Sequence, residues 1–189
     1  MQWKKMLIVD LECTCFQKED ADKPAGWTQE KDQETTEIGA VIYNLVSREI
    51  EVEKSFFVRP DGPLGAFCKE LTDLSFEDLK DQPNLEDTLK DMRAWCKGNK
   101  FDLGQQPWGS WGDFDRVQLY RECARKGLRY PFGRAHYNIK GLFSIMQHRA
   151  KGFGVGTALD LLGMEFDGRP HRGVDDARNI ANIFSRVMR

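Results

Sequence analysis

The chain has 189 residues, of which 40% are hydrophobic and 31% charged, and its formal net charge at pH 7 is −2. This composition is typical of a globular protein, and the length predicts one domain over residues 1–189. The sequence has no apolar run near the roughly 18 residues that a membrane-spanning helix requires, so we expect no contact with a membrane. Five cysteines without a Cys-x-x-Cys pair indicate reduced thiols and a cytoplasmic protein.

The first predicted strand, residues 5–12, ends in two acids. In the segment IVDLECTC, residues 8–15, an apolar run leads to Asp10 and Glu12 with one leucine between them. Alternate side chains of a strand share a face, so the two carboxylates project together and repel each other. Two interpretations stay open from this segment alone: a pair of solvated acids beside a loop, or oxygen ligands of a divalent cation.

The segments that follow predict a mixed α/β protein. Residues 16–36 are polar and predict a long loop, in which Trp27 either anchors the loop or offers a surface for a nucleobase. Two runs of β-branched and aromatic residues then predict a hairpin antiparallel to the first strand. Helical spacing of apolar residues alternates with short strands further on, which points to a mixed sheet flanked by helices. The expected ranges are strands 37–45 and 49–58, helix 85–96, strand 105–112, helix 113–125, strand 135–139, and helices 140–149, 157–162 and 173–189.

Two later element boundaries also carry acids. Asp113 and Asp115 lie where a short strand turns into a helix, and His171 precedes Asp175 and Asp176 at the start of the last helix. Acids in the first turn of a helix cap it or favour its positive end. Neither site therefore needs a function when it is taken alone.

The three acidic sites have a chemical consequence when they are taken together. Acids after the first strand, after a later strand and at the last helix can all meet at one edge of a mixed sheet. A cluster of four carboxylates at close range cannot stay ionised without cations. Two Mg²⁺ or Mn²⁺ ions would neutralise it and support in-line attack on a phosphodiester, with a nearby histidine taking a proton from water.

Basic residues are unevenly distributed along the chain. Residues 116–151, the basic block, carry nine lysines and arginines against a single acid, Glu122, whereas residues 1–115 carry 14 basic and 24 acidic side chains. Such a block is typical of proteins that bind a polyanion. A solvated helix face that happens to be basic explains it equally well, so both interpretations stay open.

The order of these motifs resembles the DEDD exonuclease superfamily, which has a ribonuclease H-like fold. Asp-x-Glu on a first strand, Phe-Asp at a strand-to-helix turn and His-x-x-x-x-Asp entering a helix occur here in that order. The resemblance implies an α/β fold with a five-stranded mixed sheet, three strands antiparallel and two parallel, flanked by helices. Segments similar to the ERI-1-like and KapD-type 3′→5′ exonucleases run along nearly the whole chain: IVDLECTC, TEIGAV, FCKELT, SWGDFD, NIKGLF, ALDLLGMEFDG and HRGVDDARNIA.

The resemblance implies roles for five residues. Asp10, Glu12, Asp115 and Asp176 would hold two Mg²⁺ or Mn²⁺ ions, and Asp10 would bridge both. His171 would be the general base, which defines the histidine subgroup, called DEDDh. The spacing of five residues between His171 and Asp176 fits that subgroup.

The resemblance also implies what the residues next to these five would do. Asp113 and Asp175 would be adjacent acids without a metal, and Arg172 stands where the tyrosine subgroup of the superfamily would have a tyrosine. Trp108 and Trp111 are further candidates for stacking on a base, although Trp111 fits a core position better. The residues expected to contact substrate are Leu11, Cys13 and Thr14, through their backbone, and Arg116 at the start of the basic block.

The implied activity is hydrolysis of the terminal phosphodiester at the 3′ end of a single-stranded nucleic acid, with release of nucleoside 5′-monophosphates. The resemblance alone favours RNA over DNA. Two alternatives stay open: a catalytically silent protein that binds nucleic acid on the same fold, and a DNA-directed proofreading exonuclease. The expected partner is a single-stranded RNA or DNA 3′ end, and the sequence leaves the oligomeric state open.

Overall fold

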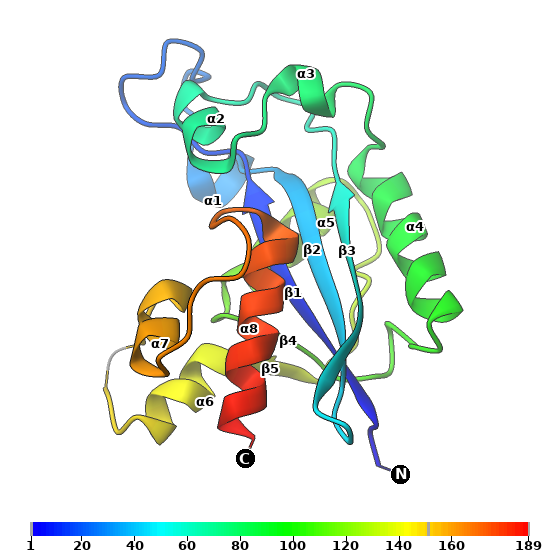
Figure 1. Cartoon of the computed structure of the whole chain (residues 1–189). Coiled ribbons are helices and arrows are strands. Elements are labelled where there is room, and N and C mark those ends of the chain that lie inside the picture. The colour runs from blue at the N-terminus through cyan, green and yellow to red at the C-terminus, as the bar shows by residue number, and fades with distance from the viewer. Residues whose placement is uncertain (1, 151, 189) are drawn as a thin grey trace.

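A five-stranded mixed sheet lies at the centre of the protein (Figure 1). The computed structural model describes residues 2–150 and 152–188. The strand order is β3-β2-β1-β4-β5, with the first three strands antiparallel and the last two parallel to β1. The predicted architecture is therefore confirmed. The strands are β1 (Lys5–Cys13), β2 (Thr35–Asn44), β3 (Glu49–Phe57), β4 (Trp108–Ser110) and β5 (His136–Asn138).

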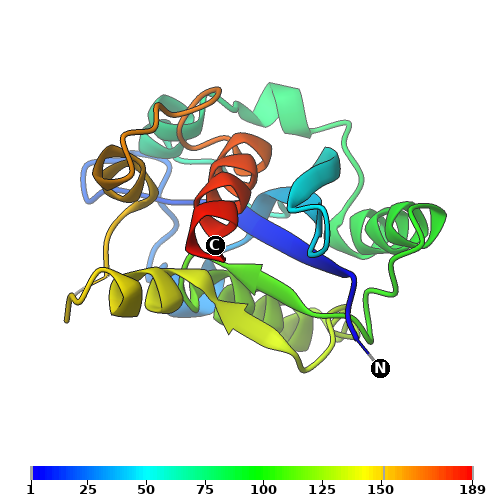
Figure 2. The same ribbon diagram turned by 60° about the horizontal axis from the view of Figure 1, so that its bottom comes forward.

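Helices cover both faces of this sheet. The last helix, α8, crosses one face, and α4 and α5 lie against the other (Figures 1 and 2). No helix in the described parts of the chain is long and apolar enough to cross a membrane. The helices are α1 (Gln29–Asp32), α2 (Ala66–Thr72), α3 (Phe76–Leu79), α4 (Leu85–Gly98), α5 (Phe114–Arg125), α6 (Ile139–Met146), α7 (Val155–Leu161) and α8 (Gly173–Val187).

Residues 6–9 of strand β1 are all apolar because both faces of the strand are buried there. Met6 and Ile8 pack with α8, whereas Leu7 and Val9 pack with residues of α4 and α5. Each of these side chains is at most 3% exposed, and full burial of such a side chain contributes about 1.5–3 kcal/mol. The strand is thus anchored on both sides, and its carboxyl end is held in place.

Helix α8 starts directly against the backbone of β2. Gly39 pairs with Asp10 in the sheet register, and a Cβ atom added to Gly39 would lie 1.9 Å from the carbonyl carbon of Gly173. Only glycine permits two backbones to approach this closely. The contact brings the first turn of α8 to the end of β1.

Several details differ from the sequence-based expectations. The predicted loop 16–36 contains the short helix α1, and β2 begins at Thr35. Helices α2 and α3 fill a stretch for which the periodicity predicted no element. Asp113 occupies the cap position of α5, but its side chain makes no capping hydrogen bond. Lys151 in the basic block and Arg189 of the predicted last helix lie outside the described residues.

Candidate active site

Three of the predicted metal ligands converge at the carboxyl end of β1. Asp10 and Glu12 project from the face of β1 that α8 covers, and Asp176 comes from the first turn of α8. Each offers a carboxylate oxygen, and these oxygens all lie within 4.8 Å of one another. We call these three residues the carboxylate cluster. They lie close enough to share a bound cation.

Asp115 approaches the cluster from the other side of the sheet. It sits in the first turn of α5, is 5% exposed, and its Oδ1 accepts a hydrogen bond of 3.0 Å from the backbone N–H of Leu11. Its carboxylate lies outside the 4.8 Å grouping. Its charge nevertheless raises the pKa of Asp10, so the fourth predicted ligand borders the cluster.

The electrostatics of these four carboxylates favour protonation in the absence of a cation. Burial, followed by the charges of Asp115 and Asp176, raises the pKa of Asp10 well above its usual range. Burial and the charge of Asp176 raise the pKa of Glu12 to about 8. Burial raises the pKa values of Asp115 and Asp176 to about 6. None of the four forms a salt bridge with any described residue, so the protein itself supplies no compensating charge.

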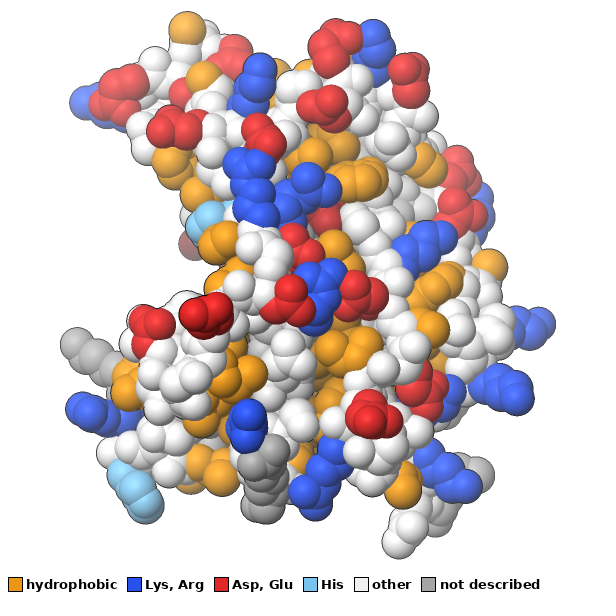
Figure 3. Space-filling model, viewed as in Figure 1, with side chains coloured by type: hydrophobic (Ala, Val, Ile, Leu, Met, Phe, Trp, Pro, Cys, Tyr) orange, Lys and Arg blue, Asp and Glu red, His pale blue; other side chains and the backbone are white. Residues whose placement is uncertain are grey.

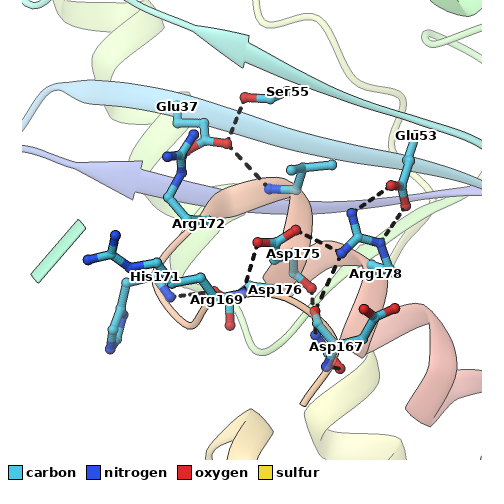
Figure 4. Close-up of polar contacts among 12 residues, drawn as sticks. Glu37, Glu53, Ser55, Asp167, Arg169, His171, Arg172, Asp175, Asp176 and Arg178 are labelled. Atoms are coloured by element: carbon cyan, nitrogen blue, oxygen red, sulfur yellow. Dashed lines mark hydrogen bonds and ion pairs between the residues drawn. The ribbon is translucent and has the colours of Figure 1, made fainter. Parts of the chain in front are cut away.

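The two neighbouring acids differ from the cluster in this respect. Asp113 is exposed and pairs with Arg116 at 3.1 Å. Asp175 pairs with Arg178 at 2.7 Å and accepts a hydrogen bond from the backbone N–H of Arg169 at 2.9 Å (Figure 4). Both acids already have a cationic partner within the chain. Compensation therefore distinguishes them from Asp115 and Asp176, which have none.

His171 is tied to the cluster through its backbone. Its N–H donates to Oδ2 of Asp176 at 2.7 Å, and its φ of +64° lies in the left-handed region. That conformation is uncommon for a residue with a side chain, and here a turn held by Asp176 supports it. The residue is exposed, and its imidazole points away from the ion pairs of Glu37 and Arg178 (Figure 4).

Two residues that the sequence reasoning missed support this turn. Glu37 is fully buried, lies opposite Glu12 in the β1–β2 register, and accepts a hydrogen bond of 2.6 Å from Oγ of Ser55. Nε of Arg172 lies 3.3 Å from its other oxygen (Figure 4). The pair links β2 to the residue after His171. The available signal was an acid inside the apolar run of TEIGAV, together with a basic residue in HRGVDD.

The residues predicted to contact substrate differ in how exposed their side chains are. Leu11 and Cys13 have their side chains in the core, 6% and 7% exposed, so only their backbone could face a substrate. The buried Thr14 borders a cavity of about 270 Å³ that Trp27 also lines. Arg116 is exposed.

The tryptophans also separate into two groups. Trp27 is half-buried and packs edge-on against Phe16 with the ring centroids 5.0 Å apart, which agrees with a loop anchor. Trp108 is 1% exposed, so the expectation that it could stack on a base is wrong: both faces of β4 are covered. Trp111 donates from Nε1 to the carbonyl oxygen of Phe153 at 2.7 Å and packs in the core near α6.

The surface is hollowed beside the start of α8. Figure 3 shows a notch between the part of the surface over α1 and α2 and the part over α7, with a histidine side chain at its upper edge and basic side chains next to it.

A sequence profile of the exonuclease family (RNase T) matches residues 7–184. The chain belongs to this exonuclease family. It is 29% identical to the fruit fly "3'-5' exonuclease Snipper" (Drosophila melanogaster), over 97% of this chain and 69% of the fly protein. It is 31% identical to the human "3'-5' exoribonuclease 1" (Homo sapiens), over 96% of this chain and 51% of the human one. The chain thus spans about half the length of the human relative.

A solved structure supports the same relationship. The nuclease domain of 3'hExo, described as a DEDDh family member bound to rAMP, superposes on this exonuclease with a TM-score of 0.83. The two are 27% identical, and the match covers 97% of this chain and 91% of that one. The predicted membership of the exonuclease family is confirmed, and the similar proteins include ERI1-type exoribonucleases and a DEDDh nuclease.

Proposed function

We propose that this member of the exonuclease family hydrolyses RNA from its 3′ end in a metal-dependent reaction that releases nucleoside 5′-monophosphates. The observation that carries the proposal is the carboxylate cluster of Asp10, Glu12 and Asp176, whose oxygens lie within 4.8 Å without a cationic partner among the described residues. Such a cluster is costly unless cations bind to it.

The residues present fit divalent cations. Carboxylate oxygens are the ligands that Mg²⁺ and Mn²⁺ prefer. Asp10, Glu12, Asp115 and Asp176 would hold two such ions. When bound, such ions lower the pKa of a coordinated water and stabilise charge on the leaving oxygen.

The chain's own residues perform the remaining tasks. His171 takes the proton from the attacking water, and its backbone hydrogen bond to Asp176 keeps it at the edge of the cluster. Glu37 and Arg172 hold the turn that carries His171. The backbone of residues 11–14 lies along the terminal nucleotide, and Arg116 attracts the strand.

RNA is the proposed substrate because of the relatives. The human relative is named an exoribonuclease, and the solved relative holds a ribonucleotide, rAMP. A 2′-hydroxyl is what separates RNA from DNA at such a site. We further propose that residues 1–189 act as one exonuclease domain in the cytoplasm, and fractionation of cells would check the compartment.

The test is a gel assay on 5′-labelled single-stranded RNA and on DNA of the same sequence, with Mg²⁺, Mn²⁺ or EDTA. Asp10→Asn, Asp115→Asn and His171→Ala should abolish the metal-dependent ladder that shortens from the 3′ end. Asp113→Asn is the matched control, because Asp113 is exposed and already paired with Arg116, and its ladder should remain.

Two outcomes would contradict the proposal. RNA binding without any product, even with Mn²⁺, would indicate a catalytically silent nucleic-acid-binding protein. Degradation of DNA in strong preference to RNA would indicate a DNA-directed, proofreading-type enzyme.

A further inference from the structure

A second cavity lies between α5 and the part of the sheet formed by β4 and β5. Its volume is about 520 Å³, which is in the range of small-ligand sites, and it is enclosed by α5, the start of β5 and the segment before β5. Its lining residues include no acid, although the whole chain has more acids than bases. The cavity is therefore chemically unlike the surface around it.

Aromatic rings form one wall of the cavity. Tyr120 is 61% exposed at its mouth and packs edge-on against Tyr130 at a centroid distance of 5.6 Å. Tyr130 contacts Phe132 in the same way at 5.6 Å, and Phe132 stacks on the buried Trp108 at 4.3 Å. The core thus holds this row of rings rigidly, while its outer end is open to solvent. A flat, apolar, aromatic ligand such as a nucleobase matches this wall.

Arginines form the rest of the rim. Arg116, Arg121 and Arg134 all line the cavity and are exposed. Arg116 pairs with Asp113, whereas Arg121 and Arg134 form no salt bridge with any described residue. Unpaired guanidinium groups beside aromatic rings suit a ligand that joins an aromatic base to a phosphate.

The cavity begins beside the active site. Arg116 directly follows Asp115, and Tyr120 lies one helical turn further along α5. His136, also in the lining, has Nε2 2.9 Å from Oγ of Ser110 at the end of β4. Arg116 and Tyr120 both line the cavity, so the first turns of α5 link Asp115, at the border of the carboxylate cluster, to this cavity.

We propose that this cavity binds a nucleotide of the substrate strand upstream of its 3′ end, with the base on Tyr120 and the phosphate at Arg121 and Arg134. The proposal rests on the function proposed above and adds a second binding site to it. The cavity then makes the enzyme favour strands long enough to reach it. It has no preference for a particular base, because every base has a face that can stack.

The first test compares kcat/KM for a dinucleotide with kcat/KM for a series of longer single-stranded RNAs. In Tyr120→Ala the ratio of kcat/KM for long RNAs to kcat/KM for the dinucleotide should fall about 10-fold, the typical effect of losing one stacked base. Tyr137→Ala is the matched control, because Tyr137 is also exposed but lies on β5 against Trp3, outside the cavity. Its ratio should equal that of the wild type.

The second test measures binding without turnover, so it stays informative even if hydrolysis is absent. The affinity for labelled single-stranded RNA is followed by fluorescence anisotropy in EDTA at several salt concentrations. Arg121→Ala should reduce the slope of log affinity against log salt by about 0.7, the value for one phosphate contact. Tyr120→Ala should lower the affinity and leave the slope unchanged. Arg93→Ala, on α4, is the control and should change neither.

The outcomes separate the two proposals. Weaker RNA binding by Tyr120→Ala without any hydrolysis by the wild type would support the cavity and contradict the exonuclease activity. If the wild type hydrolyses RNA, but Tyr120→Ala leaves the length ratio unchanged and Arg121→Ala leaves the salt slope unchanged, the cavity proposal alone is contradicted. A Tyr120→Ala variant that binds AMP more weakly but RNA as tightly as the wild type would also overturn it, because the ligand would then be a free mononucleotide.

Discussion

Two groups of carboxylates in this protein have little access to water, and they differ in how their charges are compensated. Around Lys126, Glu122 accepts hydrogen bonds from the backbone and the hydroxyl of Thr35 at 2.9 and 2.7 Å, and Nζ of Lys126 lies 2.7 Å from Glu34. In the carboxylate cluster, Asp10, Glu12 and Asp176 face one another with no such cation among the described residues. The first group is compensated within the chain, whereas the second has no compensating cation among the described residues, which is why we propose that metal ions bind there.

The comparison identifies which buried acids have a structural role. Burial raises the pKa of Glu122, as it raises that of Glu12, but Thr35 and Lys126 act in the opposite direction for Glu122. Burial by itself therefore does not indicate function. A buried acid whose neighbours are all acids is the informative case.

The largest expected effect concerns Asp10. Asp10→Asn should lower turnover by at least about 100-fold, because a metal ligand contributes several kcal/mol to the barrier. In EDTA the same variant should melt at a higher temperature than the wild type, since it removes a carboxyl group whose ionised form is destabilised by burial and by neighbouring acids. Glu122→Gln, at a more deeply buried but compensated site, should melt at a lower temperature. A fall in the melting temperature of both variants would contradict the comparison.

The next effect concerns Lys126. Lys126→Met would leave Glu122 and Glu34 without their cation, and the free energy of unfolding should fall by about 3 kcal/mol, as when one partner of a buried pair is removed. Urea denaturation gives this number. Lys90→Met removes an exposed pair with Glu86 on α4 and should cost much less, because water screens such a pair. Equal losses of unfolding free energy in the two variants would show that the ion pairs of Lys126 contribute no more to stability than an exposed pair.

Binding of a cation should stabilise the folded protein, and it should do so through the carboxylate cluster alone. At about 100 times its dissociation constant, Mg²⁺ or Mn²⁺ should raise the free energy of unfolding by about 2.7 kcal/mol. Thermal melts across a metal titration measure this gain. Glu12→Gln should lose most of it, whereas Asp113→Asn should keep it, because Asp113 already has a cationic partner. A gain that survives in Glu12→Gln would place the metal elsewhere.

A smaller effect is the pH dependence of the metal-free protein. The folded-state pKa values of about 8 for Glu12 and about 6 for Asp115 and Asp176 lie above the ordinary values of 4.5 and 3.8. The folded state therefore binds more protons than the unfolded state, and the stability that this gives is full below pH 4 and is lost as the pH rises to about 8. The slope approaches about 1.4 kcal/mol per pH unit for each group. Saturating Mg²⁺ should flatten this curve, and a flat curve in EDTA would contradict the assignment.

The sequence predicted the sheet well because its strands carry strong signals. The run before Asp10 is apolar on both faces, and the β2–β3 hairpin has dense β-branched residues. Helices α2 and α3 span seven and four residues, too few to display an apolar stripe, so periodicity could not find them.

The sequence predicted which strands and helices carry the site residues, but not the long-range contacts that position them. The phase of α5 decides whether Asp113 or Asp115 faces the cluster, and that phase depends on a contact with Leu11, 104 residues away. The Glu37–Arg172 pair spans 135 residues and leaves no local pattern. Such facts arise from tertiary packing, which a linear sequence does not display.

The close contact of Gly39 and Gly173 limits how closely the two halves of the site can approach each other. Asp10 is paired with Gly39 across the sheet, Gly39 touches Gly173, and Asp176 follows three residues later. Every link in this path is made by main-chain atoms, which vary little in size from protein to protein. This backbone contact sets a minimum separation between Asp10 and Asp176, and substitutions in the surrounding core can leave that separation unchanged.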